Sequence, residues 1–456
     1  KQEMHDALPT HLPDTCTTSV ITRSGKPSIF TNLDGVSIDQ CKSVVVISEG
    51  ANKSISDARV IQTILAAAGE LADADAPIVA EIYNETHRRI VADTFASNVV
   101  TVSTAEILAK LLVQTSRSVG LSTVYSEILS FDGCELYFHH ADWRGCSFYD
   151  AIFRFPDGVP IGVRTAEGAI LVRPDWDYVL SEDDEILIVA TDDSTIDFQS
   201  RAVAKPQPQP TKNVYLQQGI ERELLIGWND KASIIINEYA EYVMPGSVVD
   251  VLMVSPDDNV RAEIARLDAE IDEIDVRLIE KNPLDRDDLL SLDPFSYDNI
   301  IILADGGSGC DRNEVDSGNI VTLLLLRSIF QEHGDKAGAT KLITEVLDSQ
   351  NYSLVHSAGV KDVIISNRLI SMIVAQISES PGIKAVYDDL FSEDGSEIYL
   401  KPLKLYYTDF PVTLSFADLI AVAKNRDDIR IGVKVAALEE DIDKNCGITL
   451  GPAKRK

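Results

Sequence analysis

Short runs of apolar, β-branched residues alternate along the first hundred residues with stretches whose apolar residues recur at helical spacing. The runs Ser19–Thr22, Ser43–Ser48, Ile78–Ile82 and Val99–Val102 predict buried strands, because a strand covered on both faces is apolar throughout. The intervening stretches predict amphipathic helices. Strands and helices in alternation indicate an α/β fold, in which a parallel sheet carries helices on both faces.

A second sheet of the same kind is predicted in the latter half of the chain. Its strands are predicted at Glu223–Ile226, Val248–Val254, Ile274–Ile279, Asn299–Leu303, Lys341–Val346 and Asp362–Ile365. Between the two sheets, residues 134–190 predict several strands with little helix, which is typical of a smaller α+β lobe. The segment Lys205–Lys212 (KPQPQPTK) marks a boundary, because alternating prolines favour an extended linker.

The two halves of the chain are related by an internal repeat. Residues 114–137 return as residues 376–399 at a constant offset of 262, with eleven of the twenty-four positions identical. Each copy predicts two amphipathic helices that meet near a glycine, Gly120 or Gly382. We interpret Leu108, Leu112, Val124, Tyr125 and their copies as surfaces that join chains. The alternative is that both helices pack on their own sheet.

The repeat predicts how the chain is organised. Strands matching Glu223–Val254 are expected to precede Lys1, and a second copy of the strand that ends at Ala190 is expected after Lys456. Both ends of the chain are therefore expected to be incomplete. Five parts are predicted. They are a first Rossmann-like lobe with its helix pair (1–133), a small α+β lobe (134–200), a linker (201–213), a second Rossmann-like lobe with its helix pair (214–395) and a second small lobe (396–456).

Charge and composition narrow the function. The chain has 73 acidic and 41 basic residues, and its net charge of −32 argues against nucleic acid as a partner. The six cysteines show no metal-binding or redox spacing. No apolar run approaches the length of a membrane span. No Ser/His/Asp, Cys/His or metal-ligand constellation stands at readable spacing, so we predict no catalytic residues and no enzyme.

Several segments in order resemble the CASTOR/POLLUX ion-channel family. They are SDARVIQTIL, DWDYVLSEDDEILIVATDD, GWND, MPGSVVDVL and YDNIIILAD. The resemblance implies two tandem RCK units, regulators of ion conductance, in a gating ring beneath a cation channel. It further implies a homotetramer of eight RCK units joined partly through the crossover helices, with pore segments before Lys1. The expected location is the cytoplasmic face of a cell membrane, or of the nuclear envelope in a plant-like protein.

Carboxylates are the predicted ligands of a gating cation. In calcium-gated RCK domains an acid at the end of one strand binds the ion, and the resemblance assigns this role to Glu81 and to its copy Glu345. Other acids follow neighbouring strands, where ligands of open α/β sheets collect; these are Glu49, Asp57, Asp305, Glu314 and Asp316. A hard cation such as Ca²⁺ requires six or more oxygen ligands. We therefore expect Ca²⁺ or another cation to recruit several of them.

The turn after Glu223–Ile226 is the position at which a Rossmann fold binds phosphate. Gly227, Trp228, Asn229 and Asp230 form it, and they are the candidate ligand-binding residues there. With one glycine and no GxGxxG pattern, NAD is not expected. The alternative function is a nucleotide-sensing RCK subunit of a potassium transporter.

Overall fold

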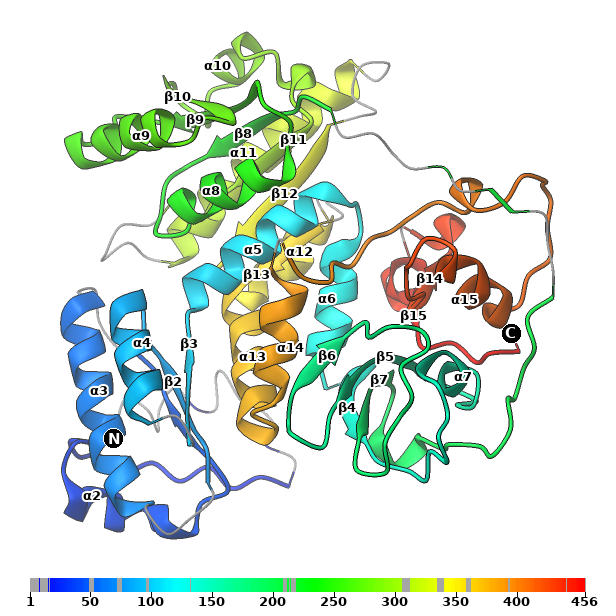
Figure 1. The fold of residues 1–456 in the computed structure, drawn as a ribbon. Helices are drawn as coiled ribbons and strands as arrows, with labels where there is room; N and C mark the ends of the chain where they lie inside the picture. The colour runs from blue at the N-terminus through cyan, green and yellow to red at the C-terminus, as the bar shows by residue number, and fades with distance from the viewer. Residues whose placement is uncertain are drawn as a thin grey trace. The chain divides into compact units, whose positions relative to one another are not determined.

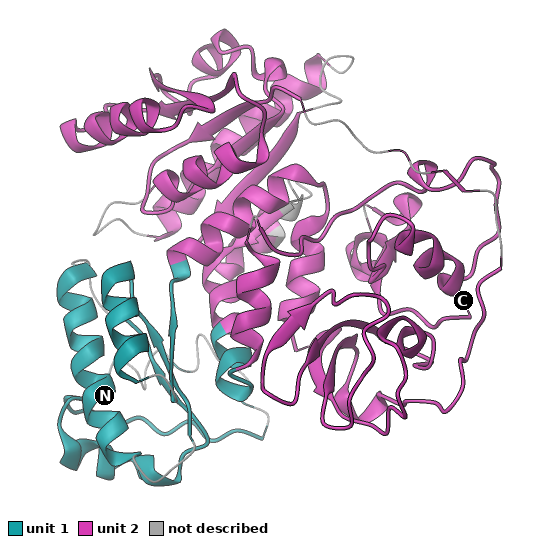
Figure 2. Cartoon of the chain, in the orientation of Figure 1, with its two compact units in different colours: residues 1–104, 374–381 teal, residues 105–373, 382–456 magenta. Residues whose placement is uncertain are grey.

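The protein is represented by a computed structural model, whose described residues are 8, 15, 17–48, 53–71, 76–95, 98–131, 133–207, 211–212, 214, 219–305, 312–333, 340–357, 362–392, 394–439 and 441–455. The chain divides into two compact units, each described by itself. One consists of residues 1–104 with 374–381, and the other of residues 105–373 with 382–456 (Figure 2). Both contain a parallel sheet with helices, which confirms the predicted α/β class.

The smaller unit is built on a three-stranded parallel sheet (Figure 1). Its strands, in spatial order, are β1 (Val44–Val46), β2 (Ile78–Glu81) and β3 (Val99–Val102). Its helices are α2 (Phe30–Asp34), η1 (Ile38–Gln40), α3 (Lys53–Glu70) and α4 (Glu85–Thr94). Helix α3 packs on β2 and α4 packs on β3, and their apolar faces meet the sheet in one core.

One predicted strand of this unit is wrong. Residues Ser19–Thr22 are irregular, and Val20 and Ile21 are 45% and 71% exposed. β-Branched residues favour a strand only where neighbouring strands pair with them and cover them. No strand of the described residues pairs with this segment.

The larger unit contains a six-stranded parallel sheet in the order β10-β9-β8-β11-β12-β13 (Figure 1). All six predicted strands are confirmed, as β8 (Arg222–Ile226), β9 (Ser247–Met253), β10 (Ile274–Glu280), β11 (Asn299–Ile302), β12 (Lys341–Val346) and β13 (Asp362–Ile365). From β8 the chain adds β9 and then β10 on one side of the sheet. It then crosses back to form β11 on the other side of β8, and adds β12 and β13 beyond it. The two directions meet between β8 and β11, the switch point at which such sheets bind ligands.

Helices cover this sheet and connect its strands. They are α8 (Ala232–Tyr242), α9 (Asp258–Glu270), α10 (Arg286–Ser291), η3 (Pro294–Ser296), α11 (Arg312–Glu332), η4 (Ser349–Asn351) and α12 (Tyr352–Ser357). The apolar face of α11 supplies Leu323, Leu326 and Ile329 to a core that includes Ile300 and Val346. That burial explains why α11 is the longest helix among the described residues.

The same unit contains two small antiparallel sheets. The first has the order β4-β7-β5-β6, with strands β4 (Glu135–His139), β5 (Val159–Arg164), β6 (Ile170–Val172) and β7 (Glu185–Ala190), and it confirms the predicted α+β lobe. The second is formed by β14 (Gly432–Lys434) and β15 (Ile448–Leu450). Short helices accompany them: α7 (Phe148–Ile152), η2 (Asp193–Thr195), η5 (Leu403–Leu405), α15 (Phe416–Lys424), η6 (Ala436–Leu438) and η7 (Ile442–Gly447).

The repeated helices are α5 (Thr104–Arg117) with α6 (Leu121–Leu129), and α13 (Ser366–Glu379) with α14 (Ile383–Leu390). Gly120, between α5 and α6, has a φ of +92°, a left-handed conformation that favours glycine. Helix α6 packs on β13 of the six-stranded sheet and on β4 of the four-stranded antiparallel sheet, and α14 packs on β6 of that antiparallel sheet. Each helix therefore contacts a sheet that belongs to the other repeat, and α6 also contacts the sheet of its own repeat.

These contacts correct the prediction that Leu108, Leu112, Val124 and Tyr125 join chains. Leu108, Leu112, Val124 and Tyr125 are at most 6% exposed within a single chain. Gln114 Nε2 donates to the carbonyl of Leu390 at 3.1 Å. The Tyr125 ring lies edge-on to the Phe391 ring, with the ring centroids 5.6 Å apart. These four side chains are therefore core residues of one chain, whereas Ile370 and Val374, the copies of Leu108 and Leu112, are half-buried.

None of the helices in the described ranges combines the length and the apolar character that a membrane span requires.

Candidate functional site

The predicted turn lies at the switch point of the six-stranded sheet. Gly227 ends β8 with a φ of +88°, and a Cβ there would stand 3.0 Å from the Cβ of Asp305. Glycine is therefore required both by the conformation and by the close approach of the neighbouring strand end. Asn229 Nδ2 donates to the carbonyl of Ala304 at 3.0 Å and to Glu345 Oε2 at 3.3 Å. The turn is thus bound to the ends of β11 and β12.

Glu345 at this edge already has a cationic partner. Its carboxylate is fully buried, and the Nζ atom of Lys231 lies 3.1 Å from Oε1. The same ammonium lies 3.5 Å from Oδ1 of Asp230. The main-chain N–H of Ala304 donates to Oε2 at 3.0 Å, and the Ser366 hydroxyl donates to Oε1. Lys231 thus supplies positive charge where the sequence predicts a metal ion.

Two acids at or near the turn have solvent-exposed side chains. Asp305 is exposed at the end of β11, and Asp230 is exposed on the turn itself. Although the side chain of Asp305 reaches solvent, desolvation by the surrounding protein atoms raises the pKa of its carboxyl, and the main-chain N–H of Trp228 opposes this by donating to it.

Asp57 and Asp316 have the same surroundings in the two repeats. Asp316 is fully buried and accepts from the main-chain N–H groups of Leu347 and Asp348, both at 2.9 Å, and from Asn351 Nδ2 at 2.8 Å. Asp57 is also fully buried. It accepts from the main-chain N–H groups of Tyr83 and Asn84, both at 3.0 Å, and is bonded to His87 Nδ1 at 2.9 Å. Both carboxylates hold the loop that follows the next strand.

Glu81 repeats two of the contacts of Glu345. Its Oε2 accepts from the main-chain N–H of Ser48 at 3.1 Å, and its Oε1 accepts from the Thr104 hydroxyl at 2.6 Å. Ser48 follows β1 closely in the chain, as Ala304 follows β11. Thr104 is the first residue of α5, and Ser366 is the first residue of α13. The repeated glutamates therefore fasten the end of a neighbouring strand to the start of a crossover helix.

The predicted metal ligands are thus divided among different environments. Asp57, Glu81, Asp316 and Glu345 accept hydrogen bonds from the protein, Glu314 is exposed in the first turn of α11, and Glu49 lies outside the described residues. Within the described ranges, no group of three or more His, Cys, Asp or Glu side chains is placed to hold a metal ion. Metal binding by these acids stays a prediction.

Sequence reasoning missed Lys231 and the hydroxyl partners Thr104 and Ser366. One signal for the latter was available: the repeat places a hydroxyl residue at the start of α5 and again at the start of α13. Lys231 had no such signal, because it lies outside the segments that the repeat at the offset of 262 matches.

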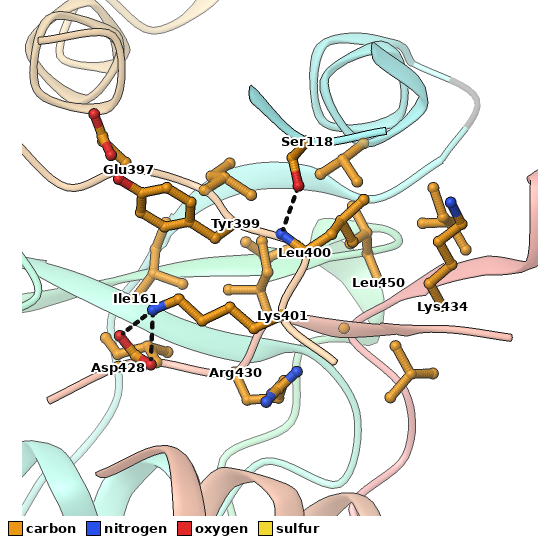
Figure 3. Close-up of a pocket in the computed structure, with 18 of the residues that line it drawn as sticks. Ser118, Ile161, Glu397, Tyr399, Leu400, Lys401, Asp428, Arg430, Lys434 and Leu450 are labelled. Carbon is orange, nitrogen blue, oxygen red and sulfur yellow. Dashed lines mark hydrogen bonds and ion pairs between the residues drawn. The ribbon is translucent and has the colours of Figure 1, made fainter. Parts of the chain in front are cut away.

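A separate cavity of about 650 Å³ lies in the larger unit (Figure 3). Side chains of the four-stranded sheet, of α6 and of residues 395–450 line it. Its polar groups are mostly paired, with Lys401 Nζ 3.1 Å from both oxygens of Asp428 and Lys434 Nζ 3.0 Å from Glu439 Oε1. None of the predicted site residues lines this cavity.

Comparisons with known proteins agree with the fold. The family described as "Castor and Pollux, part of voltage-gated ion channel" matches residues 105–205. The chain is 29% identical to a probable ion channel CASTOR of Oryza sativa over 97% of its length, and 29% identical to the ion channel CASTOR of Lotus japonicus over 93%. It covers 53% of each, so it spans about half the length of these curated relatives.

A solved structure shows the same fold. The human SLO3 gating ring superposes with a TM-score of 0.68 at 12% identity, covering 95% of this chain and 88% of that one. The named relatives are ion channels, in agreement with the prediction that the chain is not an enzyme. The sequence matches and the fold together confirm the resemblance to the CASTOR/POLLUX ion-channel family, with two RCK-like units in this chain.

Proposed function

We propose that this chain is the cytosolic regulatory region of a cation channel and couples the binding of a ligand to opening of a pore. The observation that carries the proposal is the alignment of 97% of the chain with a protein named as an ion channel. The gating-ring fold supports it. The packing of the crossover helices also supports coupling, because α6 and α14 each connect their own repeat to a sheet of the other repeat.

The proposed assembly is a homotetramer whose eight RCK units form a ring. Because Leu108, Leu112, Val124 and Tyr125 are buried within one chain, we propose that a further surface joins the chains. Helix α11 offers one, since Val321 and Leu324 are 45% and 47% exposed on it. Exposed apolar side chains on one helix suit a protein–protein contact.

The proposed ligand is a small cation, Ca²⁺ first, bound near Asp230 and Asp305. Both carboxylates reach solvent at the turn and strand end of the switch point, and the Lys231 ammonium, 3.5 Å from Asp230 Oδ1, is a positive charge with which the cation would compete. A net charge of −32 favours cation binding, but only a formed site distinguishes between cations of equal charge. Selectivity is therefore the property to measure.

Thermal melts in calcium and in magnesium at equal ionic strength test the ligand. A cation that binds only the folded state, at a hundredfold excess over its dissociation constant, adds about 2.7 kcal/mol to the free energy of unfolding. We expect Ca²⁺ to raise Tm by several degrees more than Mg²⁺ does. The double variant Asp230→Asn/Asp305→Asn should lose this difference, and Asp142→Asn, which removes an exposed acid from another loop, should keep it.

The second candidate is a nucleotide-sensing subunit of a potassium transporter. The switch point between β8 and β11 favours it, since nucleotides bind there in sheets of this topology. The same melts discriminate. A clear rise in Tm with AMP, ATP or NADH, together with equal shifts in the two metal ions, would replace the cation proposal by this one.

A further inference from the structure

Glu223 and Asn299 face each other at the start of the two middle strands of the six-stranded sheet. They lie directly opposite in the parallel pairing of β8 with β11. Each is 1% exposed, and Asn299 Nδ2 donates to Glu223 Oε2 at 3.0 Å. The same two strands lead, at their other ends, to the turn of the switch point (Figure 1). The Glu223–Asn299 pair therefore joins the strands that carry the candidate site.

Three buried oxygen atoms around this pair lack a hydrogen-bond partner among the described residues. They are Glu223 Oε1, Asn299 Oδ1 and the hydroxyl of Tyr239, which is 1% exposed on α8. An ionised carboxylate oxygen and an amide oxygen only accept hydrogen bonds, so they cannot bond to each other. A proton on Glu223 Oε1 turns this atom into a donor, for which the amide oxygen and the hydroxyl are acceptors. A buried polar group left unpaired is costly, so the arrangement favours the protonated acid.

Charged groups of both signs surround the pair. Arg117 of α5 pairs with the two carboxylate oxygens of Glu221, both at 3.4 Å. Lys341 Nζ of β12 donates to the main-chain carbonyl of Arg117 at 2.8 Å. Burial lowers the pKa of Lys341, and the negative charges of Glu221, Glu223 and Asp298 oppose this. Both cations are therefore engaged with groups other than the Glu223 carboxyl.

Burial decides the protonation of Glu223. Desolvation raises the pKa of its carboxyl from 4.5 to about 8, and the negative charge of Glu221 adds to the rise. The hydrogen bond from Asn299 and the positive charges of Arg117 and Lys341 oppose it. Tyr239 also faces the carboxyl, because the charge of Glu223 follows burial among the causes that raise the pKa of its hydroxyl. The electrostatics thus agree with the three unpaired oxygens.

We propose that Glu223 is a neutral carboxylic acid at neutral pH, and that loss of its proton in alkaline solution weakens the join between β8 and β11. Ionisation leaves a buried negative charge beside the amide oxygen of Asn299, which cannot donate to it. The fold would then contain a proton-controlled contact between the two strands. This inference does not depend on which ligand binds at the switch point.

Urea unfolding of the 456-residue protein and of its Glu223→Gln variant tests the protonation. Because the folded-state pKa lies above the ordinary 4.5, the stability from this group is complete below about pH 4.5 and is lost as the pH rises to about 8. Glutamine cannot ionise, and it still offers Asn299 a donor and an acceptor. We expect the folding equilibrium constant of the wild type, divided by that of the variant, to fall about fiftyfold from pH 6 to pH 8.

Infrared difference spectra of the same two proteins report the protonation directly. The wild-type minus variant spectrum at pH 6 should contain the C=O band of a neutral carboxylic acid, and the band should be absent at pH 10. Hydrogen exchange tests the weakened join. Protection of the β8 and β11 amides, corrected for the intrinsic pH dependence of exchange, should fall between pH 6 and pH 8 in the wild type and less in Glu223→Gln.

Glu221→Gln is the matched control. It removes a half-buried acid that precedes the same strand and pairs with Arg117, but it keeps Glu223, so its folding constant should fall with pH nearly as the wild type's does. A ratio that does not change with pH, or a difference spectrum without the neutral-acid band, would show an ionised Glu223 and overturn the proposal. Equal protection of the β8 and β11 amides in wild type and Glu223→Gln at every pH would overturn the weakened join. If Glu223→Gln does not fold, Glu223→Met is the reference that cannot ionise.

Discussion

Asp316→Asn is expected to lower the free energy of unfolding of the unit that contains the six-stranded sheet by about 3 kcal/mol or more. The carboxylate is fully buried and accepts three hydrogen bonds, two of them from the main-chain N–H groups of Leu347 and Asp348. An amide removes the charge and turns N–H groups toward donors, leaving buried groups unpaired. Urea denaturation followed by circular dichroism measures the loss.

Two variants make this result interpretable. Glu314→Gln changes an exposed acid on the same helix, and it should shift the free energy of unfolding by less than about 0.5 kcal/mol. Asp57→Asn removes the equivalent carboxylate in the first repeat, and it should destabilise the smaller unit in the same way. An Asp316→Asn protein as stable as the Glu314→Gln protein would contradict a loop-holding role.

Leu112→Ala is expected to cost about 3 kcal/mol of stability without changing the association state. Leu112 is fully buried in α5 within one chain, so its truncation leaves a cavity in the core rather than at a contact between chains. Leu112→Asp would place a carboxylate in the same core and should prevent the unit from folding. Denaturation and sedimentation of the same samples separate the two effects.

Glu106→Gln is the control on the same helix. Glu106 is 39% exposed and lies 3.7 Å from Lys110, so its loss should change stability little. If Leu112→Ala instead kept its stability and lost association, the original prediction that these helices join chains would be restored.

Apolar patterning was sufficient to predict most of the strands and the repeated helices, because buried strands of a parallel sheet are uniformly apolar. It failed at Ser19–Thr22, where the residues are β-branched but no neighbour covers them. It also could not identify what α6 and α14 pack against, since the sequence pattern of an apolar helix face is the same whether a sheet or another chain covers that face. Only the three-dimensional arrangement shows that each packs on a sheet of the other repeat.

The candidate site could be predicted only in part. Asp57, Glu81, Asp316 and Glu345 lie near the ends of strands, but each accepts hydrogen bonds from the protein, and a shared cation site stays a prediction. The hydrogen-bond partners of Asp57 and Asp316 could not be deduced, because most of the donors are main-chain groups far along the chain, which carry no sequence signature. Lys231 beside Glu345 was missed for a related reason: a lysine at a helix start is ordinarily exposed, and this one is 8% exposed.

Current recordings from the intact protein in planar lipid bilayers test the proposed function most directly. The account predicts cation-conducting openings whose probability changes when calcium is added on the side that carries this chain. It also predicts that Asp230→Asn/Asp305→Asn weakens that response while Asp142→Asn preserves it. An open probability that does not change with calcium, or that changes equally in all three proteins, would contradict cation sensing at the switch point. The absence of any conductance would contradict the channel assignment itself.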